Sequence, residues 1–345
     1  MMRLPLFEFR APNTVEEAAR ILDGEGGHAM PLAGGTDLLP NMKRRQQVPK
    51  TLMSLRNITQ LHQLQLSDSG SRLGACLTLS EIAADPRFRN GLTALAQAAS
   101  FVATPQIRNV ATLGGNLCLD TRCNYYDQNY EWRKSIGYCL KKDGDTCWVA
   151  PGSSKCMAVS STDTAPALMA LGARARLVSQ RGEREVPLAE LYQNDGIHYM
   201  KRQPDELLTE VLLNSSHGWR STYWKLRRRG SFDFPVLSVA AAARFSTNGV
   251  VEEARIIIGS AACRPLIATE ASKFLTGRAL NQETVVEAAS LASRIAKPLD
   301  NTDFDMTWRK RVTAEFVTNA LRELRGDDMS GQRLLLTRHS STDQF

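Results

Sequence analysis

The chain has 345 residues, and its 43 Lys and Arg side chains against 36 Asp and Glu side chains give a formal charge of +7. With 43% hydrophobic and 23% charged residues, the composition is that of a globular protein and excludes a disordered chain or a coiled coil. Apolar runs such as residues 165–171 are far shorter than the ~20 residues of a membrane-spanning helix. We therefore expect a soluble protein without a membrane partner. The first residues lack the apolar region of a signal peptide, so we expect a cytoplasmic location.

The first 118 residues alternate strand and helix signals. Thr14 and Glu17, like Thr78 and Glu81, have the spacing at which a hydroxyl and a carboxylate cap the start of a helix reciprocally. Apolar periodicity predicts the remaining elements of this part: strands at 7–10 and within 51–79, and an alanine-rich helix at about 91–101.

Beyond an irregular insert at about 119–159, the pattern becomes regular again. We expect a helix that begins near Asp163 and a hairpin at 173–186. Strands and helices then follow at about 207–213, 234–245, 251–259, 266–275, 283–296 and 308–325. This order predicts an α+β fold with two units: a two-lobed domain over 1–218, with lobes at about 1–56 and 57–218, and a smaller α+β domain over 219–326. The polar tail at 327–345 is expected to be disordered.

Two double-glycine turns follow apolar segments in the first domain. Gly34-Gly35 and Gly114-Gly115 each have a threonine nearby, Thr36 and Thr112. Glycine lets backbone N–H groups approach a phosphate closely, so the two turns are compatible with the two phosphates of one dinucleotide. Neither matches the nicotinamide fingerprint or the ATP-binding loop. The alternative is that both are ordinary tight turns.

The insert holds four of the seven cysteines, four of the seven tyrosines and two of the five tryptophans. Cys123, Cys139, Cys147 and Cys156 are too far apart for a structural zinc knuckle. Four thiolates suffice for an iron–sulfur cluster, which tolerates such loops between its ligands. The alternative is a set of packed or free thiols, since free cysteine packs as a small hydrophobe.

Three short basic runs invite a nucleic-acid hypothesis, because the isoelectric point is about 9.1. The runs at 43–45, 227–229 and 309–311 are far apart and lack the interleaved aromatics of single-strand binders. Solvated faces or subunit contacts explain them better, so we expect no nucleic-acid partner. The five histidines show no paired spacing, and no nucleophile motif is present, so no catalytic residue is expected in this chain.

Three motifs together resemble a known family. Pro31–Leu39, Arg108–Leu117 and Asp163–Leu168 resemble, in order and spacing, the FAD-binding medium subunits of the xanthine dehydrogenase and carbon monoxide dehydrogenase family of molybdenum hydroxylases. The resemblance covers about residues 4–325. The cysteine insert, which most medium subunits lack, resembles that of the 4-hydroxybenzoyl-CoA reductases within this family.

The resemblance implies a set of cofactor ligands. The FAD pyrophosphate and its neighbourhood would be held by the two glycine turns: Leu32, Ala33, Gly34, Gly35, Thr36, Asp37 and Leu38 in the first, and Thr112, Leu113, Gly114, Gly115 and Asn116 in the second. Asp163 would accept hydrogen bonds from the adenosine side, and Lys225 matches the family lysine near the flavin. A 4Fe-4S cluster would be ligated by Cys123, Cys139, Cys147 and Cys156.

The resemblance also implies an electron relay. A large subunit with the molybdenum cofactor and a small subunit with two 2Fe-2S clusters would complete a dimer of heterotrimers. Electrons from a ferredoxin would pass through the 4Fe-4S cluster and FAD to molybdenum, where 4-hydroxybenzoyl-CoA would become benzoyl-CoA. The alternative is the flavin subunit of a xanthine-, aldehyde- or N-heterocycle-oxidising enzyme, including aldehyde oxidoreductases with a similar 4Fe-4S loop, in which electrons flow the other way.

Overall fold

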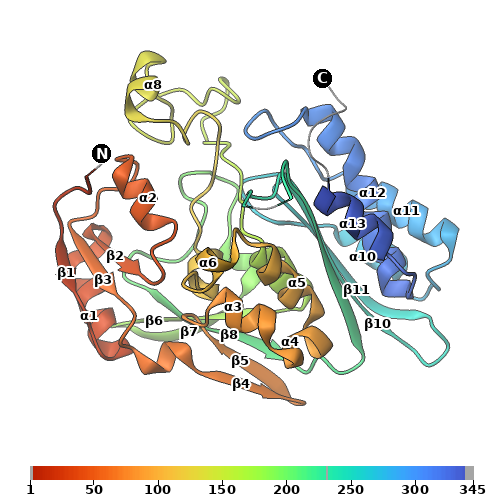
Figure 1. The fold of residues 1–345 in the computed structure, drawn as a ribbon. Coiled ribbons are helices and arrows are strands. Elements are labelled where there is room, and N and C mark those ends of the chain that lie inside the picture. Colours follow the sequence, from red (N-terminus) through yellow and green to blue (C-terminus); the bar gives the residue numbers. More distant parts are fainter. Residues whose placement is uncertain (1–2, 231, 339–345) are drawn as a thin grey trace.

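The computed structural model describes residues 3–230 and 232–338, and these form three β-sheets with helices around them (Figure 1). The separate sheets and helices confirm the α+β class predicted from the sequence. Among the described residues, none of the helices has the length and apolar character required to cross a membrane.

The N-terminal lobe is built on a parallel sheet with strand order β1-β3-β2. Thr14 caps the first helix by accepting a hydrogen bond from the Glu17 N–H at 3.1 Å. The Glu17 carboxylate instead accepts from the Asn13 N–H at 2.8 Å, so the expected reciprocal cap is only half formed. The elements of the lobe are β1 (Glu8–Arg10), α1 (Val15–Glu25), η1 (Gly26–His28), β2 (Ala29–Leu32), α2 (Leu38–Lys43) and β3 (Thr51–Ser54).

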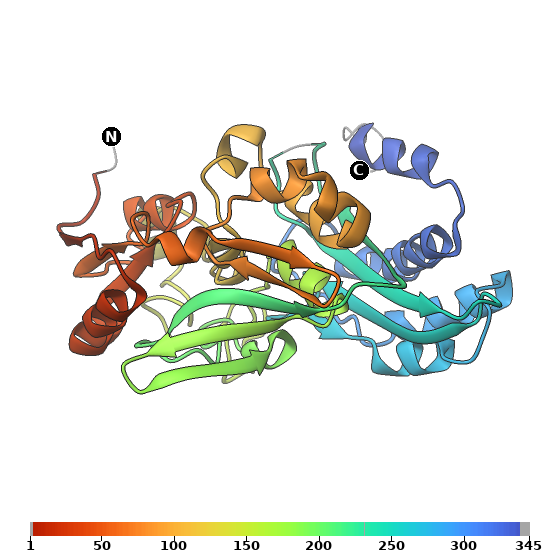
Figure 2. The same ribbon diagram turned by 90° about the horizontal axis from the view of Figure 1, so that it is seen from below.

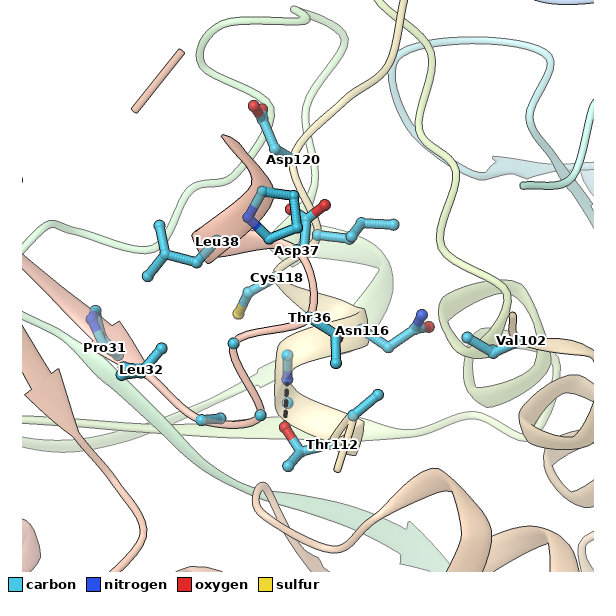
Figure 3. Close-up of a pocket in the computed structure, with 18 of the residues that line it drawn as sticks. Pro31, Leu32, Thr36, Asp37, Leu38, Val102, Thr112, Asn116, Cys118 and Asp120 are labelled. Carbon is cyan, nitrogen blue, oxygen red and sulfur yellow. Dashed lines mark hydrogen bonds between the residues drawn. The ribbon is translucent and has the colours of Figure 1, made fainter. Parts of the chain in front are cut away.

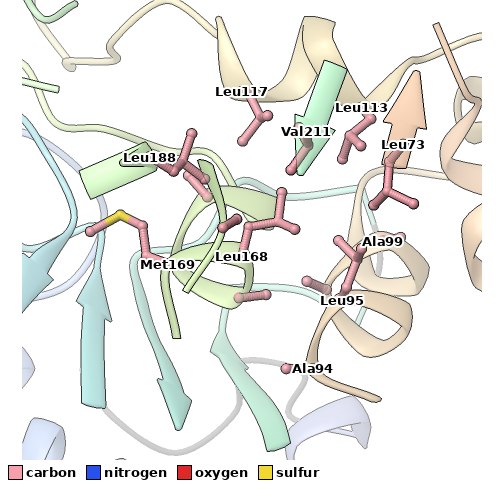
Figure 4. Packing of buried hydrophobic residues seen from close by; sticks show 14 of the residues in the cluster. Leu73, Ala94, Leu95, Ala99, Leu113, Leu117, Leu168, Met169, Leu188 and Val211 are labelled. Atoms are coloured by element: carbon pink, nitrogen blue, oxygen red, sulfur yellow. The ribbon is translucent and has the colours of Figure 1, made fainter. Parts of the chain in front are cut away.

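The centre of the molecule is an antiparallel sheet with strand order β4-β5-β8-β6-β7. Leucine and alanine side chains from its strands and from the adjoining helices form the largest buried cluster (Figure 4). The strands are β4 (Leu64–Ser67), β5 (Gly70–Gly74), β6 (Arg174–Ser179), β7 (Gly182–Pro187) and β8 (Leu207–Asn214). The helices are η2 (Thr59–His62), α3 (Leu79–Ala84), α4 (Pro86–Gly91), α5 (Thr93–Phe101), α6 (Pro105–Arg108), α7 (Leu113–Leu117), α9 (Thr164–Ala170) and η3 (Leu188–Leu191). Thr78 and Glu81 form the full reciprocal cap of α3.

The C-terminal domain packs helices against an antiparallel sheet with strand order β12-β11-β10-β9. Its strands are β9 (Trp219–Leu226), β10 (Leu237–Phe245), β11 (Val251–Gly259) and β12 (Leu266–Ile267). Its helices are α10 (Thr269–Leu275), α11 (Gln282–Ser293) and α12 (Met306–Arg325). The N-terminal lobe and this domain lie at opposite ends of the molecule, with the five-stranded sheet between them (Figure 2).

The cysteine insert departs from this regularity. Helix α8 (Tyr130–Ser135) is its one helix among the described residues, and the rest is turns and isolated bridges. Figure 1 shows α8 at the top of the molecule, away from the sheets.

The expectation of a disordered tail from residue 327 needs correction. Residues 330–338 form helix α13 (Ser330–Arg338). Met329 is buried in the C-terminal core, and the Arg333 guanidinium stacks 4.2 Å from the Trp224 ring centroid. The Arg333 side chain also donates to the Glu323 carboxylate at 2.9 Å. These tertiary contacts outweigh the polar composition on which the prediction of disorder was based. Residues 339–345 lie outside the described residues.

Candidate functional site

A cavity of about 410 Å³ lies where the N-terminal lobe meets the helices above the central sheet. Both double-glycine turns and Asp163 line it, together with segments that carry no recognisable motif. Of the predicted flavin ligands, the lining contains Leu32, Ala33, Gly34, Gly35, Thr36, Asp37, Leu38, Thr112, Gly114, Gly115, Asn116 and Asp163.

The first glycine turn requires its two glycines for different reasons. A Cβ on Gly34 would lie 1.9 Å from the carbonyl oxygen of Val110, just before the second turn. Gly35 has a φ of +70°, in the left-handed region that glycine adopts without strain. The turn connects β2 to α2 and lies beside the short helix α7 of the second turn (Figure 3). The two predicted turns therefore meet in one cavity.

The second glycine turn is fixed by side-chain caps. Thr112 accepts a hydrogen bond from the Gly115 N–H at 3.1 Å, the contact drawn in Figure 3. The Asn116 Oδ1 accepts from the Thr162 hydroxyl at 2.8 Å and from the N–H and hydroxyl of Thr164 at 3.0 and 2.7 Å. With its oxygen occupied in this way, the Asn116 amide keeps its NH₂ group for a ligand in the cavity.

Two predicted flavin ligands lie outside the cavity wall. Leu113 is fully buried in the hydrophobic core. Lys225 is buried on β9, where its ammonium donates to the Phe101 carbonyl at 2.9 Å and to the Asp163 carboxylate at 3.0 Å. The hydroxyl of Tyr223 donates to the other Asp163 oxygen at 2.6 Å. Both carboxylate oxygens of Asp163 therefore accept hydrogen bonds from side chains of β9. These bonds join α9 to the C-terminal domain.

Burial governs the electrostatics of this ion pair. Desolvation raises the pKa of the Asp163 carboxyl, although the Lys225 ammonium and the Tyr223 hydroxyl oppose the change. Desolvation likewise lowers the pKa of Lys225, against the attraction of Asp163. Removing one partner of an ion pair so completely enclosed strongly destabilises a protein, because the other charge is left buried and unpaired.

Several cavity residues were not among the site residues predicted from the sequence. Arg122 is 6% exposed, forms ion pairs with Asp37 and Asp127, and stacks 4.8 Å from the Phe234 ring centroid. Phe234 belongs to the loop between β9 and β10, so the C-terminal domain contributes to the wall. Further cations line the cavity at Arg44 and Arg202. The one local hint for Arg122 in the sequence is that it directly precedes Cys123, the first cysteine of the insert.

The four cysteines of the insert are buried and close together. Cys123, Cys139 and Cys156 belong to one small buried cluster, and Cys147 is 5% exposed. Burial raises the pKa of Cys123 to about 12, and the neighbouring thiols of Cys156 and Cys139 contribute. Burial raises the pKa of Cys156 to about 11, with contributions from Cys147 and Cys139. The environment of Cys123 and Cys156 therefore includes the other thiols of the insert.

The geometry of the cysteines is nevertheless not that of a formed metal site. Within residues 3–230 and 232–338, no group of three or more His, Cys, Asp or Glu side chains is arranged to hold a metal ion. Cys118 lines the cavity, and the Cys263 thiol donates to the Cys156 carbonyl at 3.4 Å. Cys76 is buried in the N-terminal lobe.

A buried guanidinium within the cysteine insert lacks hydrogen-bond acceptors. Arg133 on α8 is 1% exposed, and no group among the described residues accepts a hydrogen bond from its three side-chain nitrogens. In that part of the chain its guanidinium forms an ion pair with the more exposed Asp143, at 3.5 Å. The Tyr138 N–H donates to the Arg133 carbonyl at 2.7 Å, which ties α8 to the segment that carries Cys139. A buried cation in this state favours an anionic group nearby.

Comparison with known proteins identifies the family of both domains. Residues 5–213 match the family described as FAD binding domain in molybdopterin dehydrogenase, and residues 221–324 match the CO dehydrogenase flavoprotein C-terminal domain. A solved structure of Cu,Mo-CO dehydrogenase has a TM-score of 0.77 at 25% identity, covering 94% of this chain and 99% of that one.

Curated relatives cover most of the chain. The aldehyde oxidoreductase FAD-binding subunit of Escherichia coli is 32% identical, covering 75% of this chain and 82% of the relative. The nicotinate dehydrogenase FAD-subunit of Eubacterium barkeri is 28% identical, covering 81% and 82%. The carbon monoxide dehydrogenase medium chain of Afipia carboxidovorans is 28% identical, covering 91% and 95%. The chain belongs to the FAD-binding medium subunits of the molybdenum hydroxylase family, to which the xanthine and carbon monoxide dehydrogenases belong.

Proposed function

We propose that this chain is the FAD and 4Fe-4S electron-transfer subunit of a molybdenum-dependent 4-hydroxybenzoyl-CoA reductase. The observation that carries the proposal is the gathering of four buried cysteines in one insert next to the glycine-lined cavity. A flavoprotein without a second redox centre has no need for such an insert.

The cavity residues suit FAD. Gly34 and Gly35 line the cavity, and glycine allows backbone N–H groups to approach a pyrophosphate closely. Arg44 and Arg122 supply positive charge to the same cavity. The glycine turns and Asn116 are thus assigned to the cofactor, whereas Lys225 lies behind the cavity wall and holds Asp163, which lines the cavity.

The insert suits a cluster with four thiolate ligands. Cys123, Cys139, Cys147 and Cys156 are assigned as its ligands, because iron–sulfur clusters take four cysteines. A cluster with four thiolates is an anion, and the acceptor-free guanidinium of Arg133 supplies a cation in the same insert. Tyr126, which is buried among the cysteines, helps to exclude water and so influences the reduction potential.

The two cofactors together supply electron transfer, since a flavin exchanges one or two electrons and an iron–sulfur cluster exchanges one. This chain would bind them, fix their separation and keep water away. Two electrons from a ferredoxin and two protons from solvent, used on a partner subunit, would convert 4-hydroxybenzoyl-CoA into benzoyl-CoA and water. The partners in this proposal are a molybdenum-cofactor large subunit and a 2Fe-2S small subunit, assembled as a dimer of heterotrimers in the cytoplasm.

A second candidate is the flavin subunit of an aldehyde- or N-heterocycle-oxidising enzyme. It is favoured by the 32% identity to the aldehyde oxidoreductase subunit and the 28% identity to the nicotinate dehydrogenase subunit. In that case electrons would leave the substrate and exit through this chain.

Two measurements test the proposal. Anaerobically purified protein should contain about one FAD and about four iron atoms per chain, as expected for one such cluster. The complex purified from its native host should then be assayed with 4-hydroxybenzoyl-CoA and a low-potential reductant, and with xanthine and aldehydes and an oxidant. Absence of iron would refute the cluster, and turnover of an aldehyde alone would establish the second candidate.

A further inference from the structure

A buried lysine connects the cysteine insert to the flavin cavity. The Lys141 ammonium donates to the Asp120 carboxylate at 2.8 Å, to the Thr121 hydroxyl at 2.8 Å and to the Gly196 carbonyl at 2.6 Å. The side chains of Lys141 and Asp120 are each 7% exposed. An ammonium has three N–H donors, and here each has an acceptor. The lysine is therefore held in one position.

On one side, Lys141 belongs to the environment of the cysteines. It lies two residues after Cys139, in a turn closed by a 2.9 Å hydrogen bond from the Lys142 N–H to the Cys139 carbonyl. The Gly196 N–H donates to the Cys156 carbonyl at 2.8 Å, and a Cβ on Gly196 would lie 2.7 Å from the Cys156 sulfur. Lys141 therefore binds the backbone of a loop that packs directly against one of the thiols.

On the other side, Lys141 holds the wall of the cavity. Asp120 lines the cavity, and its second oxygen accepts from the Tyr126 hydroxyl at 3.0 Å. The ammonium also lies 4.8 Å from the Tyr126 ring centroid and 5.7 Å from that of Tyr199, another lining residue. In Figure 3, Asp120 lies at the end of the cavity near Asp37 and Leu38 of the first glycine turn.

We propose that the Lys141–Asp120 pair couples the two cofactor sites, so that cluster assembly strengthens FAD binding and FAD binding strengthens cluster retention. The inference rests on the proposed function, because it requires the cluster. Ligation at Cys139 and Cys156 would immobilise the 139–142 turn and the Gly196 loop. Lys141 belongs to the first segment and donates a hydrogen bond to the second, so its ammonium would hold Asp120 in a fixed position. Coupling between two binding sites is reciprocal, and typical values are about 5- to 150-fold in affinity.

The first test measures FAD affinity in two states of the full chain. Protein reconstituted anaerobically with ferrous iron and sulfide is compared with iron-free protein, and FAD fluorescence gives the dissociation constants. We expect FAD to bind about tenfold more tightly to the iron-loaded chain. In Lys141→Met this ratio should fall to about one, because the link between the turn and Asp120 is removed. Lys142→Met, on the neighbouring half-buried lysine, should keep the ratio of the unmodified protein.

The second test measures the midpoint potential of the iron-loaded chain, which loss of packing alone would not shift. Removing a buried cation next to a cluster makes electron uptake less favourable. Lys141→Met should lower the midpoint potential of the iron-loaded chain, and Lys141→Arg, which retains the charge, should restore most of it. A tenfold change in the equilibrium constant corresponds to 59 mV for a one-electron couple.

The outcomes separate this inference from the proposed function. If the unmodified chain takes up no iron, the proposed function is wrong and the coupling fails with it. If iron is bound but the affinity ratio is one, or is unchanged in Lys141→Met, only the coupling is refuted. Should Lys141→Met fail to fold, Asp120→Asn replaces it, since this variant preserves side-chain size and removes the charge. An unchanged ratio in Asp120→Asn would likewise refute the coupling.

Discussion

The glycine-lined cavity, which we propose binds FAD, and the cysteine insert are neighbours with opposite construction. The cavity is formed by backbone turns between regular elements, and Gly34 lies so close to the Val110 carbonyl that a Cβ would not fit between them. The insert has the six-residue helix α8, a small buried cluster and the acceptor-free Arg133. A site made from backbone can form before its ligand arrives. One made from side chains on irregular loops depends on the ligand for much of its stability.

The largest expected effect is on iron. Cys139→Ser should abolish nearly all cluster iron, because a missing thiolate leaves one iron without its protein ligand. FAD should remain bound at saturating concentration, because the glycine turns do not need the insert. Iron and flavin analysis of the anaerobic protein measures both. Cys76→Ala, at a buried thiol outside the insert, should keep the iron. Equal loss of iron and flavin in Cys139→Ser would contradict the contrast drawn between the cavity and the insert.

The next largest expected effect is on the stability of the whole molecule. Lys225→Met should reduce the free energy of unfolding by about 3–5 kcal/mol, because it leaves the Asp163 carboxylate buried without its cation. Urea unfolding measures this change, and flavin and iron should be released at the same lower urea concentration. The exposed Lys201 serves as control, since Lys201→Met should unfold like the unmodified chain. Near-normal stability of Lys225→Met would show that the ion pair does not join the domains.

A smaller effect is confined to the cavity. In Gly34→Ala the new Cβ would meet the Val110 carbonyl at 1.9 Å, and backbone atoms there cannot move aside without shifting the turn. Such overpacking costs about 1–3 kcal/mol, which corresponds to a loss of FAD affinity of about 5- to 150-fold. Gly27→Ala, where a Cβ has open space, is the matched control. Flavin titration that finds equal affinities for the two variants would show that the turn is not part of the site.

The smallest effect concerns the cap of the second turn. Thr112→Ala removes the acceptor for the Gly115 N–H, and loss of an N-cap costs about 1 kcal/mol. We expect FAD to bind about fivefold more weakly. Thr14→Ala removes the equivalent cap of α1, far from the cavity, and should leave FAD affinity unchanged while lowering the melting temperature slightly. A similar flavin loss in both variants would indicate a general effect of stability.

Local signals in the sequence predicted a large part of this molecule. The glycine turns and the threonine caps are visible because short-range backbone geometry requires those residue types. The cavity wall at Arg122 and Phe234 was not predictable, since it depends on how the C-terminal domain packs against the first. The same is true of Lys225, whose partner Asp163 lies 62 residues earlier, and of α13, whose contacts with Trp224 and Glu323 are tertiary.

The lining of the flavin cavity extends along the chain from Met30 to Phe234. During synthesis the first glycine turn therefore emerges from the ribosome long before the loop that completes the last wall. A nascent chain that ends before β9 would carry both turns yet leave the cavity open where Phe232 and Phe234 belong. We therefore expect cofactor capture to await the folding of the C-terminal domain, and a truncated product to hold its flavin poorly.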